Sequence, residues 1–357
     1  RKCLSVTNLS EQDLKVENVN VFDFRAAWHP TYNWTMTDYG RRMTIGKYEG
    51  DAQDCLITLH SVREHRGMAL GNEAPGVTKY SSVFSDGERI TVGMTPFDHI
   101  FPTRKWITPE ETWDSPWAFV ALYSDTDNPM TVLETTISDF TRKHLGTRIA
   151  KAKQIPMLVY NNWNPFRANV TEELMMELAD AASECGVREF ILDAGWYTLK
   201  NPTKKLAWNS ACGDYITDPS KFPNGLDSLF AHVESLGMKP GLWFSLAMAS
   251  DQSEIYQTYP EWFVIGKEGN HVCLHGPHAH NRTACMSTNW YDYILDVISE
   301  KVSKNNLSYL KLDLAIVASA YHFDTETTGC YSTNHPLHRD RNESFLVIYQ
   351  RAWQLFD

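Results

Sequence analysis

Apolar runs and helix-like stretches alternate along the second half of the chain. Four short apolar runs have the length and composition of buried parallel strands, at residues 157–161, 189–193, 239–245 and 309–313. Four longer stretches are predicted to be helices, at residues 171–185, 226–236, 290–303 and 341–356. Gly186 and Gly237 stop the first two of these helices. This alternation predicts an α/β fold, a parallel sheet with crossover helices.

The first 130 residues have a different pattern, in which short strand-like segments lie between turns. Clear examples are at residues 54–60, 80–84, 89–93 and 117–123. After them, Val132, Ile137, Phe140 and His144 have helical spacing and predict a helical connector over residues 131–145. We therefore expect a β-rich region at 1–130, a helical linker at 131–154 and an α/β region at 155–357.

Each predicted strand of the α/β region ends in a polar side chain. These residues are Asn161, Asp193, Ser245 and Asp313. The carboxyl ends of parallel strands meet at one rim, where barrel enzymes carry their active sites, so we expect a site there. Four strand–helix units make half a barrel and leave two sheet edges open. Either another sheet closes the half-barrel or the chain is a fragment. We expect a fragment, with Arg1 as a processed or truncated start.

Composition excludes two classes of partner. The chain has 33 basic and 44 acidic residues, a formal net charge of -11, and no basic cluster that would attract nucleic acid. It also has no apolar run long enough to span a bilayer, so no membrane is expected. Aromatic residues make up 12% of the chain. This indicates either a large aromatic core or a carbohydrate cleft, because the C–H faces of sugars pack on aromatic rings.

The seven cysteines are scattered and include no C-x-x-C pair. An odd, irregular set argues against a disulfide framework and leaves the redox compartment open. Glycosylation sequons count only in a host that glycosylates; they begin at Asn8, Asn33, Asn169, Asn281, Asn306 and Asn342. A secreted or periplasmic location is favoured over a cytoplasmic one. The oligomeric state is left open, a homo-oligomer included.

One tract is rich in candidate metal ligands. It contains His271, Cys273, His275, His278 and His280. The alternative is a solvent-exposed loop over the barrel mouth, and this is the interpretation that we prefer.

Two strand-terminal carboxylates are the strongest candidates for chemistry. Asp193 and Asp313 each close an apolar strand, where an unpaired carboxylate would be costly. A single such residue would more often cap a helix, but two at equivalent positions favour a functional role. Lys311 faces the same way as Asp313 by the period of two, and a lysine beside a carboxylate keeps it ionised.

Seven short motifs follow one another along residues 155–357. They are N-N-W at 161–163, L-D-A-G-W at 192–196, G-D-Y at 213–215, D-P-S-K-F-P-N-G-L at 218–226, G-L-W-F at 241–244, Y-P-E-W at 259–262 and K-L-D at 311–313. In order and spacing this stretch resembles glycoside hydrolase family 36, the α-galactosidases and their relatives. The resemblance implies that residues 155–357 are the first half of a (β/α)8 TIM-type barrel, and that residues 1–130 are the C-terminal part of a β-sandwich domain.

The resemblance also implies a retaining mechanism on an oligosaccharide or glycoside, with neither a cofactor nor a metal. Asp313 corresponds to the nucleophile, which forms a covalent glycosyl-enzyme. The positions that correspond to substrate-binding residues are Asp193, Lys311, Trp163, Tyr215, Asp214 and Arg282. No motif for the acid/base occurs in the chain, and Asp324, Asp340 and Asp357 stand in the wrong context for it.

Departures from the family pattern affect the identity of the sugar more than the bond that is cleaved. Ala194 stands in place of a second aspartate, Tyr215 in place of a tryptophan, and G-L-W-F-S-L-A-M at 241–248 lacks the family's acidic residues. Loss of a carboxylate changes discrimination between sugars, so an N-acetylgalactosaminide or an arabinopyranoside is a credible variant. Two other functions stay open: α-galactosyl transfer of the raffinose-synthase type, and a non-catalytic carbohydrate-binding remnant.

Overall fold

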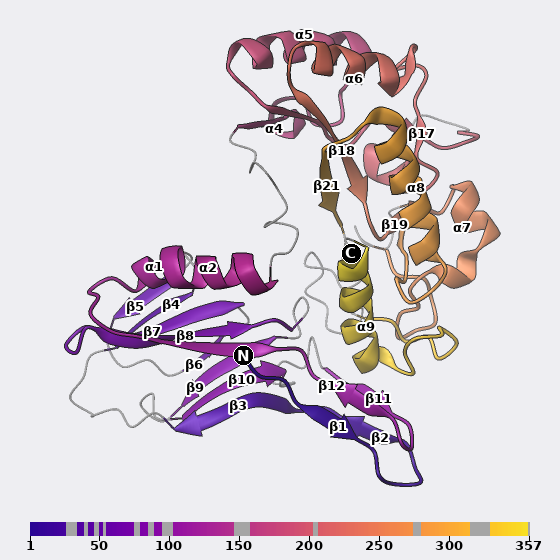
Figure 1. Ribbon diagram of the computed structural model, residues 1–357. Coiled ribbons are helices and arrows are strands. Elements are labelled where there is room, and N and C mark those ends of the chain that lie inside the picture. The colour runs from indigo at the N-terminus through magenta and orange to yellow at the C-terminus, as the bar shows by residue number, and fades with distance from the viewer. Residues whose placement is uncertain are drawn as a thin grey trace. The chain divides into compact units, whose positions relative to one another are not determined.

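The computed structural model divides into two compact units, Arg1–Lys153 and Gln154–Asp357 (Figure 1). It describes residues 1–25, 34–38, 42–45, 50–52, 55–74, 79–84, 89–94, 103–145, 158–202, 206–273, 280–314 and 329–355. All seven cysteines lie within these ranges and are free thiols in this structure. Among the described residues, every helix is too short or too polar to cross a membrane.

The first unit contains antiparallel β-structure. One sheet has the strand order β13-β8-β7-β4-β5, a second has the order β3-β10-β9-β6, and two short ribbons pair β1 with β12 and β2 with β11. The strands are β1 (Ser5–Thr7), β2 (Leu14–Val16), β3 (Val19–Arg25), β4 (Trp34–Asp38), β5 (Arg42–Ile45), β6 (Gly50–Ala52), β7 (Leu56–Ser61), β8 (Arg66–Asn72), β9 (Tyr80–Phe84), β10 (Arg89–Met94), β11 (Lys105–Ile107), β12 (Thr112–Asp114) and β13 (Ala118–Tyr123). The four expected strands correspond to β7, β9, β10 and β13.

Apolar side chains of both larger sheets share one core. Ile57 and Leu59 of β7 lie in the same buried cluster as Val83 of β9 and Ile90 of β10. Because these strands belong to different sheets, the unit is built as two antiparallel sheets with a common apolar interior.

The helix expected over residues 131–145 is present and lies within the first unit, where it packs on strands of the five-stranded sheet. It comprises α1 (Pro129–Val132), η2 (Leu133–Ile137), α2 (Ser138–Phe140) and η3 (Thr141–Leu145), the two η segments being π-helical. The Asn128 side chain caps its start by accepting a hydrogen bond from the backbone N–H of Met130 at 3.0 Å. Val132 and Ile137 are buried in one cluster with Phe119 of β13.

The second unit contains a four-stranded parallel sheet with the order β14-β15-β18-β21. Its strands and helices are β14 (Val159–Asn161), α4 (Trp163–Phe166), α5 (Glu172–Glu184), β15 (Glu189–Leu192), β16 (Tyr197–Thr198), η4 (Trp208–Ser210), β17 (Ile216–Thr217), α6 (Gly225–Ser235), β18 (Lys239–Ser245), β19 (Met248–Ser250), α7 (Glu254–Thr258), η5 (Pro260–Trp262), β20 (Asn281–Thr283), α8 (Trp290–Asn305), β21 (Tyr309–Asp313) and α9 (Arg341–Gln354). The predicted strands and helices of this region are confirmed with shifts of a few residues at their ends.

Helix starts and stops follow local chemistry. Thr171 caps α5 by accepting from the Leu174 N–H at 3.2 Å, and Asp340 caps α9 by accepting from the Glu343 N–H at 3.0 Å. Gly186 and Gly237 follow α5 and α6 with positive φ angles of 78° and 79°, a conformation that glycine adopts without strain.

Central and edge strands of the parallel sheet differ in burial. Every residue of β15 is buried, and so is β18 apart from its first residue. At the edges, Leu158 and Val159 are 46% and 38% exposed, and all five residues of β21 are half-buried. Central parallel strands are covered on both faces, whereas the described residues leave both edges of this sheet partly uncovered.

Candidate active site

The four polar strand-end residues lie at the same end of the parallel sheet. Asn161 ends β14, Asp193 directly follows β15, and Ser245 and Asp313 end β18 and β21. The parallel register pairs Asn161 with Ile191, Leu192 with Leu242, and Ser245 with Asp313. The predicted rim of strand-terminal polar groups is therefore confirmed.

Asp193 is the centre of a buried hydrogen-bonded cluster on this rim. Its Oδ2 accepts from Lys311 Nζ at 2.6 Å and from Asn161 Nδ2 at 2.7 Å, and its Oδ1 accepts from the Ala194 N–H at 2.7 Å. The Asp193 side chain is only 2% exposed, whereas that of Lys311 is 34% exposed. The lysine thus compensates a carboxylate that would otherwise be buried without a counter-charge. We call Asp193, Lys311 and Asn161 the Asp193 cluster.

Lys311 pairs with a different carboxylate from the one we expected. The period of two placed it beside Asp313, on its own strand, but its ion pair reaches across β18 to Asp193. The alternation of side chains along one strand tells which face of the sheet Lys311 points to. Its ion-pair partner depends on how the neighbouring strands are aligned with that strand.

Asp313 has few partners among the described residues. Its Oδ1 accepts a hydrogen bond from the Leu314 N–H at 2.8 Å, and its side chain forms no described ion pair. Leu314 has a φ of 48°, a left-handed conformation that is unfavourable for a branched residue. Strained backbone of this kind, at a cost of about 1–3 kcal/mol, concentrates at functional sites.

Trp163 is bonded through its backbone to one member of the Asp193 cluster. Its backbone N–H donates to Asn161 Oδ1 at 2.9 Å, so the same asparagine contacts both Trp163 and Asp193. The half-buried indole of Trp163 meets the ring of Trp208 edge-on, with centroids 5.2 Å apart. Trp208 was not anticipated, because nothing in its local sequence distinguishes it from a core tryptophan.

The hydroxyl of Tyr215 is hydrogen-bonded to the backbone at the end of β18. Tyr215 is 1% exposed, its hydroxyl donates to the Ser245 carbonyl at 2.7 Å, and that hydroxyl accepts from the Ser245 N–H at 3.2 Å. Burial raises the pKa of Tyr215 well above its usual value, so the phenol stays neutral. Tyr215 packs with Trp196 and Phe244, so much of the aromatic content of this unit forms core.

Asp214 and Arg282, the other two residues predicted to contact the substrate, also form hydrogen bonds with protein groups. Asp214 accepts from the N–H groups of Lys200, Glu254 and Ile255, at 3.1 to 3.2 Å, and so ties the start of α7 to a preceding loop. Arg282 of β20 donates from Nη2 to Asp251 Oδ2 at 2.8 Å. The structure therefore brings Asp193 and Lys311 together, and places Asp214, Tyr215 and Arg282 in separate sets of contacts.

The residues set aside as acid/base candidates and as metal ligands are only partly described. Asp340 caps α9, while Asp324 and Asp357 lie outside the described residues. In the histidine-rich tract, His271 Nδ1 lies 2.7 Å from the Tyr256 hydroxyl and His280 Nδ1 lies 3.1 Å from Asp251 Oδ1. His275 and His278 are outside the described residues. The described residues of the tract do not form a group of potential metal ligands.

Comparison with known proteins finds α-galactosidases among the relatives of this chain. Residues 112–335 match the family model described as Melibiase. The chain is 29% identical over 236 residues to the α-galactosidase AgaA of Geobacillus stearothermophilus, across 63% of this chain and 29% of that protein. It is 31% identical over 163 residues to an α-galactosidase of Escherichia coli, across 46% of this chain and 22% of that protein.

Solved structures show the same fold over nearly the whole chain. The α-galactosidase AgaB of Geobacillus stearothermophilus, of glycoside hydrolase family 36, has a TM-score of 0.73 at 22% identity and covers 99% of this chain. A variant of AgaA solved with raffinose has a TM-score of 0.72 at 22% identity. The chain spans about half the length of these two structures, at 48% and 49%. The resemblance noted from the motifs is confirmed: this chain belongs to the Melibiase family.

Proposed function

We propose that the protein carrying this chain is a retaining glycoside hydrolase that removes terminal α-galactosyl groups, or the closely related N-acetylgalactosaminyl or arabinopyranosyl groups. The observation that carries this proposal is the Asp193 cluster, on the rim that also ends in Asp313, in a chain of the Melibiase family. The relatives at 29% and 31% identity are named α-galactosidases, which supports the sugar class. The proposed substrate is an oligosaccharide or another glycoside.

Asp313 is the proposed nucleophile. It ends β21 with one described hydrogen bond, from the Leu314 N–H to Oδ1. In the retaining mechanism one carboxylate oxygen attacks the anomeric carbon while a second carboxylic acid, roughly 5 Å away, protonates the leaving oxygen. Water, activated by that second carboxyl, then releases the sugar with retained configuration. We assign the second carboxyl to a residue beyond the described ones.

The Asp193 cluster and Trp163 are the proposed sugar subsite. The ammonium of Lys311 has three N–H donors and uses one for Asp193, and the Asp193 oxygens accept hydrogen bonds, so the pair suits sugar hydroxyls. The ring of Trp163 offers an apolar surface to the sugar's C–H face. Tyr215, Asp214 and Arg282 form hydrogen bonds with other protein groups. We propose that they support the structure around this subsite without contacting the sugar.

For the architecture, we propose that residues 155–357 form the N-terminal half of a (β/α)8 barrel. Residues 1–130 would be the C-terminal part of a β-sandwich domain, and residues 131–154 the linker. The exposure of Leu158 and Val159 at one sheet edge supports a sheet that continues, because unpaired strand edges with apolar residues are unfavourable in water.

Product analysis with the full-length protein tests the function. The protein is incubated with an α-galactoside such as raffinose, and the products are followed by chromatography and by NMR of the anomeric proton. We expect free galactose, released first as the α-anomer. The β-anomer as first product would exclude a retaining mechanism.

The same measurement separates the two other functions. A longer oligosaccharide in place of free galactose would indicate the transferase. Binding of the sugar without any turnover, in a full-length protein with a cooperative thermal transition, would indicate a carbohydrate-binding remnant. Hydrolysis is favoured over both because the relatives' names describe galactosidases.

A further inference from the structure

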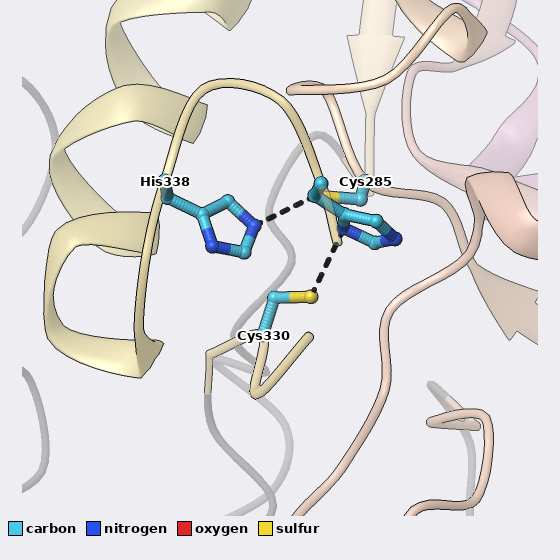
Figure 2. Close-up of side chains that lie close together, drawn as sticks. Cys285, Cys330 and His338 are labelled. Carbon is cyan, nitrogen blue, oxygen red and sulfur yellow. Dashed lines mark hydrogen bonds between the residues drawn. The ribbon is translucent and has the colours of Figure 1, made fainter. Parts of the chain in front are cut away.

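Four thiol and imidazole side chains meet at one buried point of the second unit. They are Cys285, Cys330, His335 and His338, with exposed fractions of 0%, 0%, 7% and 3%. One donor atom from each lies within 4.8 Å of the other three. Figure 2 shows Cys285, Cys330 and His338 converging. We call this group the Cys285 cluster; it is separate from the proposed sugar subsite and shares no residue with it.

Two of the distances within the Cys285 cluster match those expected between ligand atoms of a tetrahedral metal ion. Cys285 Sγ lies 3.7 Å from His338 Nε2, and Cys330 Sγ lies 3.3 Å from His335 Nδ1. Zinc binds sulfur at about 2.3 Å and imidazole nitrogen at about 2.0–2.1 Å in a tetrahedron, which places neighbouring ligand atoms about 3.3–3.8 Å apart. Both measured separations lie in that range.

Hydrogen bonds from neighbouring groups orient two of the ligands. His335 Nε2 lies 3.0 Å from the carbonyl oxygen of Glu261, which can only accept, so Nε2 carries the proton. In the neutral imidazole with this tautomer, Nδ1 presents its lone pair toward Cys330. The Ser287 hydroxyl lies 2.9 Å from Cys285 Sγ, where it can donate to a thiolate. A backbone carbonyl behind a histidine ligand is the usual outer shell of a protein zinc site.

We propose that Cys285, Cys330, His335 and His338 bind one structural Zn²⁺ ion. Two cysteines and two histidines are a standard zinc ligand set, and four protein ligands leave no position for a substrate or water. A disulfide would use Cys285 and Cys330 alone and would leave two buried imidazoles beside it without a role. A nucleophilic cysteine would need access to a substrate, and these thiols are fully buried.

The proposed ion cross-links two segments that are distant in sequence. Cys285 lies between β20 and α8, whereas the other three ligands lie just before α9, which starts at Arg341. A backbone hydrogen bond also joins this second segment to the rest of the unit, from the Tyr331 N–H to the Ile265 carbonyl at 2.8 Å. Because the segment follows β21 in the chain, the ion would fix part of the loop that leaves the strand end carrying Asp313.

This ion would take no part in the sugar chemistry. The family resemblance implies catalysis without a metal, and the proposed site has no open coordination position. The proposal therefore stands or falls independently of the glycosidase activity.

Metal analysis of the full-length protein tests the proposal. The protein is produced in zinc-supplemented medium, freed of loosely bound metal by gel filtration, and analysed by mass spectrometry for metals. We expect one zinc per chain, and loss of that zinc in Cys285→Ser and His338→Ala. Cys185→Ser, which changes an exposed cysteine, should keep it. Cys273→Ser should also keep it; loss there with retention in Cys285→Ser would move the metal to the histidine-rich tract.

A second measurement covers the case in which the variants do not fold. Wild-type protein is stripped by a chelator and reloaded with Co²⁺, which in a tetrahedral site with thiolate ligands gives strong visible absorption and a sulfur-to-metal charge-transfer band. The same metal should protect Cys285 and Cys330 from alkylation. Wild-type protein without zinc and without this spectrum, or with a Cys285–Cys330 disulfide found by peptide mass mapping, would overturn the proposal.

Discussion

Two buried polar clusters among the described residues of the second unit differ in how their charges are balanced. In the Asp193 cluster a carboxylate is paired with the ammonium of Lys311 and the amide of Asn161, so it is complete without any added group. The Cys285 cluster has two thiols and two imidazoles and no cationic side chain within it. A cluster of lone-pair donors is stable when a cation joins it, whereas an ion pair is stable by itself. The two clusters should therefore respond in opposite ways to changes of side chain and of metal.

The largest effect is expected when the ion pair is broken from one side. Lys311→Met leaves the Asp193 carboxylate buried without a counter-charge, which should lower the free energy of unfolding by about 3–5 kcal/mol. Urea denaturation of the full-length protein measures this. Combining Lys311→Met with Asp193→Asn should restore part of the loss. Lys304→Met, which breaks an exposed pair with Asp227, should cost less than about 1 kcal/mol. Equal losses in both lysine variants would contradict a special role for the Asp193 cluster.

Removal of zinc is expected to have the next largest effect. An ion present at about 100 times its dissociation constant stabilises the folded state by about 2.7 kcal/mol. A chelator should therefore lower the Tm of the wild-type protein by several degrees, and leave the Tm of Cys285→Ser unchanged. A chelator effect of the same size in Cys285→Ser would place the metal elsewhere.

A smaller effect is expected for Trp163, the aromatic residue of the proposed subsite. Trp163→Ala removes the half-buried ring while leaving the Asp193 cluster intact, so KM should rise about tenfold, or ~1.4 kcal/mol, with kcat much less affected. Steady-state kinetics on an aryl galactoside measures both. Trp353→Ala, on the exposed surface of α9, is the matched control and should leave KM unchanged. A fall in kcat alone would argue that Trp163 acts in the transition state.

The smallest effect is expected for Tyr215→Phe, which tests whether Tyr215 contacts the sugar or only supports the subsite. Tyr215→Phe removes a hydroxyl that bonds the Ser245 carbonyl and N–H, at a cost of about 1–2 kcal/mol in stability. A lower Tm with an unchanged KM is expected if Tyr215 acts only through β18. A higher KM at an unchanged Tm would return Tyr215 to direct substrate contact.

The two clusters also show what the sequence could predict. Asp193 and Asp313 were identified because each ends an apolar run, and strands of one parallel sheet bring such ends together. The partner of Lys311 was not predicted, because strand period assigns a face and not the residue opposite on another strand. The Cys285 cluster was missed because Cys285 lies far from Cys330 in sequence and the cysteines form no C-x-x-C pair. Its only local signal is the close spacing of Cys330, His335 and His338, which the longer histidine-rich tract obscured.

Covalent trapping tests the central assignment most directly. The full-length protein is treated with a fluorinated galactosyl fluoride. This reagent forms the glycosyl-enzyme quickly, and the glycosyl-enzyme is then hydrolysed slowly. The labelled peptide is located by mass spectrometry. We expect one sugar per chain on Asp313, and no label in Asp313→Asn, although that variant should melt like the wild type. Asp296→Asn, at an exposed position of α8, should label normally. A sugar attached to Asp193 or to any residue other than Asp313 would contradict the assignment of the nucleophile.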